Sequence, residues 1–112
     1  MIQKIFIETN RGPVARVTFC LPDSMWAEEV TLVGDFNGWN YTSHPFQRDR
    51  QGKWRLTVDL ELGRAYQFRY LRDGRDWMND SQADACVHTR YGSDNFLVIT
   101  DPHFKQYCDE RI

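Results

Sequence analysis

Two tryptophans follow tight-turn signals in the sequence. Trp39 comes directly after Asn37-Gly38 in LVGDFNGWN, and Trp77 lies just beyond Asp73-Gly74 in DGRDWMND. The face of an indole is electron-rich, and the C–H groups on the flat face of a glucose ring carry partial positive charge. Trp39 either folds back into the core or is held out for a ligand. For Trp77, surface stacking and loop anchoring are the two alternatives, and a sugar is the ligand that two exposed indoles suit.

Polar side chains that suit sugar hydroxyls occur near these tryptophans in the expected fold. Arg69 alternates with Phe68 and Tyr70 and therefore points away from their face, while Ser93 and Asn95 belong to the loop TRYGSDN before the last apolar run. Such groups supply planar donors and acceptors around a sugar ring. Two other roles stay open: an ion pair between Arg69 and an acidic neighbour on the sheet, and hydrogen bonds from Asn95 within its own loop.

Catalytic and metal-dependent chemistry has weaker support in the sequence. Glycoside hydrolysis needs two carboxylates in a cleft, whereas Asp73, Asp76, Asp80 and Asp84 lie in or near one loop where acids are usually solvated. The three histidines lack metal-ligand spacing, and neither a Cys-x-x-Cys pair nor a glycine-rich phosphate loop occurs. We therefore expect no catalytic residue, no metal and no cofactor.

Composition and charge narrow the class of protein. The chain has 112 residues and a net charge of −2, with acidic and basic residues well mixed, which argues against nucleic acid as a partner. No apolar run approaches the length of a membrane span, and the N-terminus lacks the features of a signal peptide. The length predicts a single domain over residues 1–112. Three cysteines do not indicate a disulfide framework, so a cytoplasmic protein is expected.

The elements that must position the candidate residues are predicted to be strands. Apolar residues alternate with polar ones, and turn signals separate the runs, as in half-buried antiparallel strands. The sequence predicts an all-β, immunoglobulin-like sandwich of about seven strands, which suits this length. A short helix is an alternative near Ala83 to Cys86, or in the tail from His103 to Glu110. The clearest strand segments are Val14–Leu21, Glu29–Val33, Lys53–Leu60, Ala65–Arg72 and Asn95–Thr100.

Individual residues in these segments have predictable structural roles. Trp54 shares a face with Leu56 and Val58 and is expected in the core. Asn37-Gly38 predicts a type I′ turn, in which both central residues have positive φ. Asp35 and Asp73 are expected to form turn hydrogen bonds through their side chains.

The order of motifs resembles one family. VTLVGDFNGWN, then GKWRLTVDLELGRAYQFRYLRDGRDW, then YGSDNFLVI are similar to the glycogen-binding carbohydrate-binding modules. That family includes the β subunit of AMP-activated protein kinase and the N-terminal early-set modules of isoamylases and branching enzymes. The resemblance covers residues 13–100, leaves 101–112 as a C-terminal tail, and is nearest to small bacterial proteins in which the module stands alone.

The resemblance implies a fold, a ligand and a site. The fold is an immunoglobulin-like sandwich, and the ligand is an α-1,4-glucan such as glycogen, starch or a maltooligosaccharide. The loop DGRDW is one residue longer than the pattern of the kinase subunit, and arginine replaces its lysine at position 69. The residues matched to the family's sugar-binding positions are Trp39, Trp77, Arg69, Tyr91, Ser93 and Asn95.

Two functions follow as alternatives. The first is non-catalytic glucan binding through surface tryptophans. The second is a protein-interaction or self-association module of the same fold, which docks on a glucan-metabolising enzyme without binding sugar itself. Exposed aromatics and edge strands would serve that second function, with a homodimer as one form of it.

Overall fold

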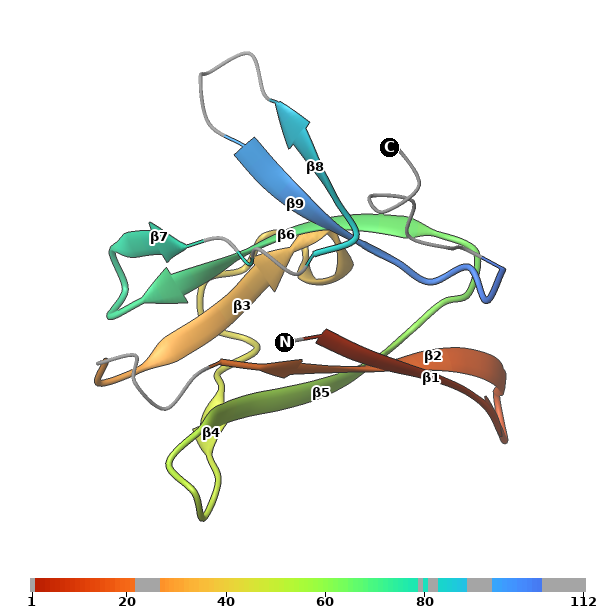
Figure 1. Cartoon of the computed structure of the whole chain (residues 1–112), viewed down its shortest axis with the longest axis horizontal. Helices are drawn as coiled ribbons and strands as arrows, with labels where there is room; N and C mark the ends of the chain where they lie inside the picture. The colour runs from red at the N-terminus through yellow and green to blue at the C-terminus, as the bar shows by residue number, and fades with distance from the viewer. Residues whose placement is uncertain (1, 22–26, 79, 81–82, 89–93, 104–112) are drawn as a thin grey trace, which may run out of the picture.

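Two antiparallel sheets form the protein, as the computed structural model shows in Figure 1. It describes residues 2–21, 27–78, 80, 83–88 and 94–103, and of residues 88 and 94 only the backbone. The first sheet has the order β1-β2-β5-β4, and the second has the order β3-β6-β9-β8, with β7 paired to β6. This arrangement confirms the predicted all-β, immunoglobulin-like sandwich.

The strands are short and joined mainly by turns. A single-turn 3₁₀ helix, η1 (Asp35–Asn37), follows β3. Within the described part of the chain, no helix is long and apolar enough to cross a membrane. The strands are β1 (Ile2–Thr9), β2 (Gly12–Cys20), β3 (Val30–Gly34), β4 (Gln47–Arg48), β5 (Trp54–Leu60), β6 (Ala65–Arg72), β7 (Asp76–Met78), β8 (Ala85–His88) and β9 (Asp94–Ile99).

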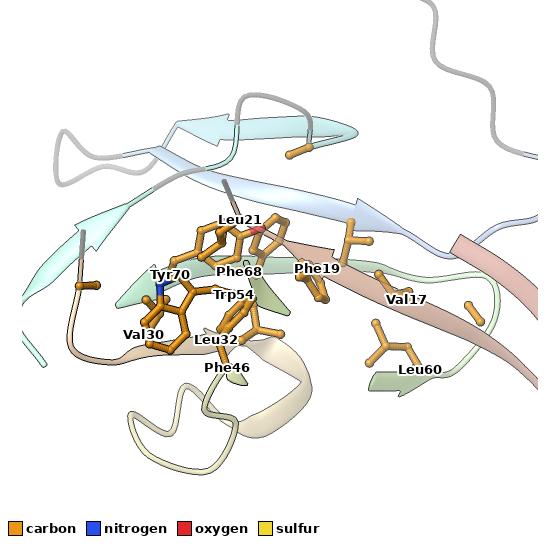
Figure 2. Close-up of a cluster of buried hydrophobic side chains, with 14 residues drawn as sticks. Val17, Phe19, Leu21, Val30, Leu32, Phe46, Trp54, Leu60, Phe68 and Tyr70 are labelled. Atoms are coloured by element: carbon orange, nitrogen blue, oxygen red, sulfur yellow. The ribbon is translucent and has the colours of Figure 1, made fainter. Parts of the chain in front are cut away.

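The core lies between the two sheets and is rich in aromatic rings (Figure 2). Phe19 of β2 packs against Phe68 of β6 with ring centroids 5.3 Å apart, in an edge-to-face geometry that aromatic pairs favour. Tyr70 and Leu32 contribute from the second sheet, and both are fully buried. The alternation read from the sequence is therefore confirmed, and so is the core position of Trp54, whose exposed fraction is 6%.

The structure has more strands than the sequence predicted. The described residues contain nine strands instead of about seven, and β1, β4, β7 and β8 were not predicted. The helix expected near Ala83 to Cys86 is wrong, because residues 85–88 pair with β9. Just before β8, the Asp84 N–H donates to Leu97 O at 3.0 Å. Pairing with a neighbouring strand thus decides the conformation of a segment too short to show a clear period. The alternative helix in the tail falls mostly outside the described residues.

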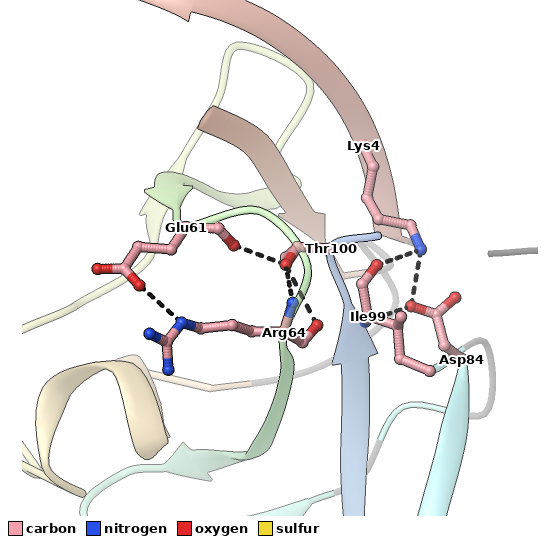
Figure 3. Close-up of polar contacts among 6 residues, drawn as sticks. All are labelled: Lys4, Glu61, Arg64, Asp84, Ile99 and Thr100. Carbon is pink, nitrogen blue, oxygen red and sulfur yellow. Dashed lines mark hydrogen bonds and ion pairs between the residues drawn. The ribbon is translucent and has the colours of Figure 1, made fainter. Parts of the chain in front are cut away.

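Two polar junctions tie the sheets together at one end of the sandwich (Figure 3). Thr100 is fully buried, and its Oγ1 donates to Glu61 O at 2.6 Å and accepts from the Arg64 N–H at 3.0 Å. Lys4 Nζ on β1 donates to Asp84 Oδ2 at 2.7 Å, and the same oxygen accepts from the Ile99 N–H at 2.7 Å. The first junction anchors the turn before β6, and the second joins the edge strand of one sheet to the other sheet.

Asp73 connects the β6–β7 turn to a different part of the chain. Asp73 and Gly74 have positive φ angles of 54° and 73°, as a type I′ pair requires. The Asp73 side chain was expected to bond its own turn, but its Oδ1 accepts from the N–H groups of Glu28 and Glu29 at 2.8 and 3.0 Å. Those backbone donors, Glu29 first, hold the pKa of the Asp73 carboxyl below its usual range.

Replacing Thr100 with valine should destabilise the fold. The variant keeps the shape of the buried side chain but removes the hydroxyl that bonds the Arg64 N–H and Glu61 O, at a cost of about 1–3 kcal/mol. Urea unfolding measures this free energy. Thr57→Val is the matched control, because Thr57 is exposed and its hydroxyl bonds, among the described residues, the hydroxyl of Thr18. Equal stability of the two variants would contradict the role given to Thr100.

Asp73 should make the stability of the fold sensitive to acid. Because the folded state lowers its pKa, the charged form stabilises the fold above the unfolded pKa of about 3.9, and this contribution is lost as the pH falls through the folded value. Asp73→Asn should therefore lose less stability than the parent protein between pH 5 and roughly pH 2. Thermal unfolding at a series of pH values tests this, and parallel curves for the two proteins would disprove it.

Candidate functional site

The outer face of the second sheet carries most of the described candidate residues. Phe68 and Tyr70 point into the core, so Gln67, Arg69 and Leu71 of β6 point outward. Antiparallel pairing sets neighbours beside them. Leu71 lies between Thr31 of β3 and Trp77 of β7, Arg69 lies opposite Val33, and Gln67 lies opposite Leu97. The face is thus built from four different strands.

This outer face has an apolar floor. Val33 and Leu71 have exposed fractions of 0% and 3%, although both point away from the core cluster. Their burial means that other side chains of the outer face cover them. The rings and polar groups above them therefore rest on a packed layer, which favours a fixed arrangement over loose surface side chains.

Trp77, Arg69 and Tyr41 form one cluster on this face. The Arg69 guanidinium carbon lies over the Trp77 ring, 5.2 Å from its centroid, within the range of a cation–π contact. Tyr41 packs against the same indole at 5.3 Å between centroids and 82° between planes. Trp77 therefore stays at the surface although its loop is one residue longer than the family pattern, and its exposed fraction is 36%. Within the described residues, the buried Nε of Arg69 has no hydrogen-bond partner.

Trp39 lies in the turn after β3, beside β6, and is half-buried. Its Nε1–H donates to Asp35 Oδ1 at 2.9 Å, while Asp35 Oδ2 accepts from the Gln67 N–H at 2.8 Å. The exposed Asp35 carboxylate thus connects the indole directly to β6. Asp35 was expected to bond within its turn, and it also bonds across to another strand. Trp39 is neither a core plug nor a free side chain.

The turn that presents Trp39 differs from the one predicted. Asn37 ends η1, and the positive φ angles belong to Gly38 (62°) and Trp39 (59°), so the type I′ prediction for Asn37-Gly38 is wrong. The reason is the Asn37 side chain, whose Oδ1 accepts from the Gly34 N–H and whose Nδ2 donates to Leu32 O. These bonds hold Asn37 against the end of β3 and shift the left-handed pair one residue along the chain.

Gly34 allows β3 and β6 to approach closely before this turn. A Cβ at Gly34 would lie 2.5 Å from Gln67 O and 2.9 Å from a ring carbon of Phe36. Only glycine fits this position without a shift of backbone. Its close contact with β6 places the next residue, Asp35, within reach of the Gln67 N–H.

Asn95 of β9 lies beside Gln67 and Arg69 of β6, and we call these three residues the polar row. The Asn95 Nδ2 donates to Gln67 Oε1 at 2.9 Å, so its side chain bonds to β6. The structure therefore brings Asn95, Arg69 and Trp77 to one face of one sheet, and the Asp35 carboxylate ties Trp39 to the same strand, β6. The two remaining candidates, Tyr91 and Ser93, lie outside the described residues.

Three residues of this face were not identified as candidates from the sequence. Asp35 and Gln67 link Trp39 to Asn95. Tyr41 reaches Trp77 from the loop after Trp39. For Gln67 the sequence held a usable signal, because it alternates with Phe68 and therefore shares the outward face with Arg69. Nothing in the sequence alone indicated that residue 41 would meet residue 77.

The acidic residues that clustered in the sequence serve separate structural contacts. Asp80 is buried and accepts from the Tyr70 hydroxyl at 2.8 Å, and burial beside this carboxylate raises the pKa of Tyr70. Asp84 bonds Lys4, Asp73 bonds the backbone of Glu28 and Glu29, and Asp76 pairs with Arg72. Each of these four carboxylates thus has a contact within the fold. The candidate face itself offers aromatic surface and hydrogen-bonding groups, which suit binding of a polar ring compound.

Comparison with known proteins points in the same direction. The family model for carbohydrate-binding module 48, the isoamylase N-terminal domain, matches residues 15–103. A 1,4-alpha-glucan branching enzyme of Photobacterium profundum is 40% identical over 107 residues, which cover 89% of this chain and 14% of that protein. The corresponding enzyme of Hydrogenovibrio crunogenus is 34% identical over 87 residues, covering 73% of this chain and 10% of that protein.

A shorter stretch is more similar to a eukaryotic relative. The 1,4-alpha-glucan-branching enzyme of Dictyostelium discoideum is 59% identical over 32 residues, which make up 29% of this chain and 5% of that protein. The chain thus spans only 5 to 14% of the length of these relatives.

Gly34→Ala should disturb the surroundings of Trp39 as well as lower stability. The added Cβ would collide with Gln67 O and separate β3 from β6, weakening the bridge through Asp35. Near-UV circular dichroism and the thermal midpoint measure the two effects. Gly63→Ala is the control, since its Cβ meets nothing within 4 Å and only its φ of 75° is unfavourable. An unchanged tryptophan signal in Gly34→Ala would contradict this link.

Proposed function

Since the chain belongs to the carbohydrate-binding module 48 family, the isoamylase N-terminal domain, we propose that it binds an α-1,4-glucan without cleaving it. Glycogen, starch and maltooligosaccharides are the ligands of this class. The observation that carries the proposal is the outer face of one sheet, which carries Trp77, Arg69 and Asn95, with Trp39 tied by Asp35 to the central strand of that face, β6. The names of the relatives, 1,4-alpha-glucan branching enzymes, support this choice of glucan.

In this proposal the two tryptophans contribute apolar contact with sugar rings. Trp39 is half-buried, and its Nε1–H is engaged by Asp35, so the orientation of its ring is set before any ligand arrives. Trp77 is held between Arg69 and Tyr41. Aromatic rings fixed in this way lose little conformational entropy when a ligand binds, which favours affinity.

The polar row would bond the sugar hydroxyls. Arg69 lies over the ring of Trp77, and its guanidinium nitrogens are donors only, which suits the oxygen atoms of sugar hydroxyls. Asn95 uses its amide nitrogen on Gln67, and its amide oxygen accepts no hydrogen bond from the described residues, so it can accept one from a sugar hydroxyl. We extend the proposal to Tyr91 and Ser93 as the loop side of the site, on the strength of the family resemblance.

The proposal predicts saturable glucan binding that depends on Trp39. Titration of the protein with β-cyclodextrin and with glycogen, followed by tryptophan fluorescence, should show quenching at millimolar ligand or below. Trp39→Ala should weaken binding roughly tenfold or more, because truncation removes most of the buried apolar contact. Affinity should change little between low and high salt, since stacking and hydrogen bonds to a neutral ligand are only weakly screened.

Phe6→Ala is the matched control. Phe6 is an exposed aromatic residue, with an exposed fraction of 41%, on β1 of the other sheet. Its loss should leave glucan binding unchanged. If the folded parent protein gives no response to either ligand, glucan binding is wrong for this chain, and a protein-interaction module becomes the better hypothesis. Equal effects of Trp39→Ala and Phe6→Ala would reject the placement of the site.

A further inference from the structure

We infer that Tyr41 contacts the sugar as a third stacking residue, beside Trp39 and Trp77; this inference rests on the proposed function. Tyr41 lies in the loop that follows Trp39 and is the most exposed of the large hydrophobic side chains found at the surface of the described residues, with a fraction of 56% against 36% for Trp77. It belongs to the same cluster as Trp77 and Arg69. Its exposed ring therefore extends the candidate face.

The cluster leaves Tyr41 more open to a ligand than Trp77. Arg69 covers one face of the indole. The perpendicular contact between Tyr41 and Trp77, at 82°, can form in two ways. If the edge of Tyr41 meets the face of Trp77, neither face of Tyr41 is used in the contact. If the edge of Trp77 meets the face of Tyr41, the opposite face of Tyr41 stays open. Either way, this contact leaves at least one tyrosine face for a sugar ring.

The loop holds Tyr41 in place by side-chain hydrogen bonds on both sides. Asn40 Oδ1 accepts from the N–H groups of Thr42 and Ser43 at 2.8 and 3.1 Å. Ser43 Oγ contacts Asn37 Nδ2 at 3.3 Å, which links the loop to η1. An exposed aromatic ring on such a restrained loop is pre-organised for contact, whereas a ring on a loose loop would lose entropy on binding.

A tyrosine at this place also suits the chemistry of a glucan. Its ring offers an apolar face for the C–H groups of the sugar, and its hydroxyl can donate to or accept from a sugar hydroxyl. The cover of Arg69 over one face reduces what the indole alone can offer. Tyr41 supplies an open face within the same cluster.

Isothermal titration with maltoheptaose tests the inference in the parent protein, Tyr41→Ala, Tyr41→Phe, Trp77→Ala and the Tyr41/Trp77 double alanine variant. Tyr41→Ala should weaken binding about tenfold, from the loss of one stacked ring, while its thermal midpoint stays that of the parent. Tyr41→Phe should keep most of the affinity, because the ring is retained. The weakening caused by Tyr41→Ala should persist in the Trp77→Ala background.

Three results would overturn the inference. If Tyr41→Ala binds like the parent while Trp39→Ala has lost affinity, the proposed function stands and Tyr41 does not contact the sugar. If the effect of Tyr41→Ala disappears in the Trp77→Ala background, Tyr41 acts only by bracing the indole. If the folded parent itself does not bind maltoheptaose, the proposed function fails, and this inference fails with it.

Discussion

The close approach of β3 to β6 at Gly34 is the contact on which the candidate face depends. A side chain there would meet Gln67 O at 2.5 Å and Phe68 Cβ at 3.0 Å, so the two strands can meet at this point only over glycine. Once they meet, Asp35 can accept the Gln67 N–H and hold the Trp39 indole with its other oxygen. The absence of a Cβ at Gly34 therefore permits the bridge from β6 through Asp35 to Trp39.

The alternating side chains of β6 serve two different purposes, because those on one face pack in the core and those on the other form the candidate face. Its inward residues, Phe68 and Tyr70, are fully buried against Phe19 of the opposite sheet. Its outward residues, Gln67 and Arg69, carry the hydrogen bonds and the cation–π contact of the candidate face. Because successive side chains of a strand point to opposite faces, one strand can be firmly held by the core and still present a binding surface. The outer face can thus change its ligand contacts without disturbing the core.

The shape of the site agrees with binding better than with catalysis. The candidate residues spread over the exposed face of a sheet, and the acids near Trp77 in the sequence each accept bonds from a separate element of the fold. An extended polymer can lie along such a face and touch several rings at once. Such binding needs no enclosed pocket, because the aromatic rings are already held in place by contacts such as Trp39 with Asp35 and Trp77 with Arg69.

Sequence alone determined the fold class, the faces of the main strands and the family. Apolar alternation identified Phe68 and Tyr70 as core and Arg69 as outward-facing, because a period of two has one structural meaning. Prediction from local sequence was wrong where contacts with distant residues determine the conformation. Residues 85–88 form a strand because they pair with β9, and Asn37 does not form the expected type I′ turn because its side chain bonds the end of β3. The partners of Trp39 and Trp77 were likewise hidden, since Tyr41 meets Trp77 only after the strands have paired. Periodicity records which side of a strand a residue occupies, but only the packed sheets bring residues distant in the chain into contact.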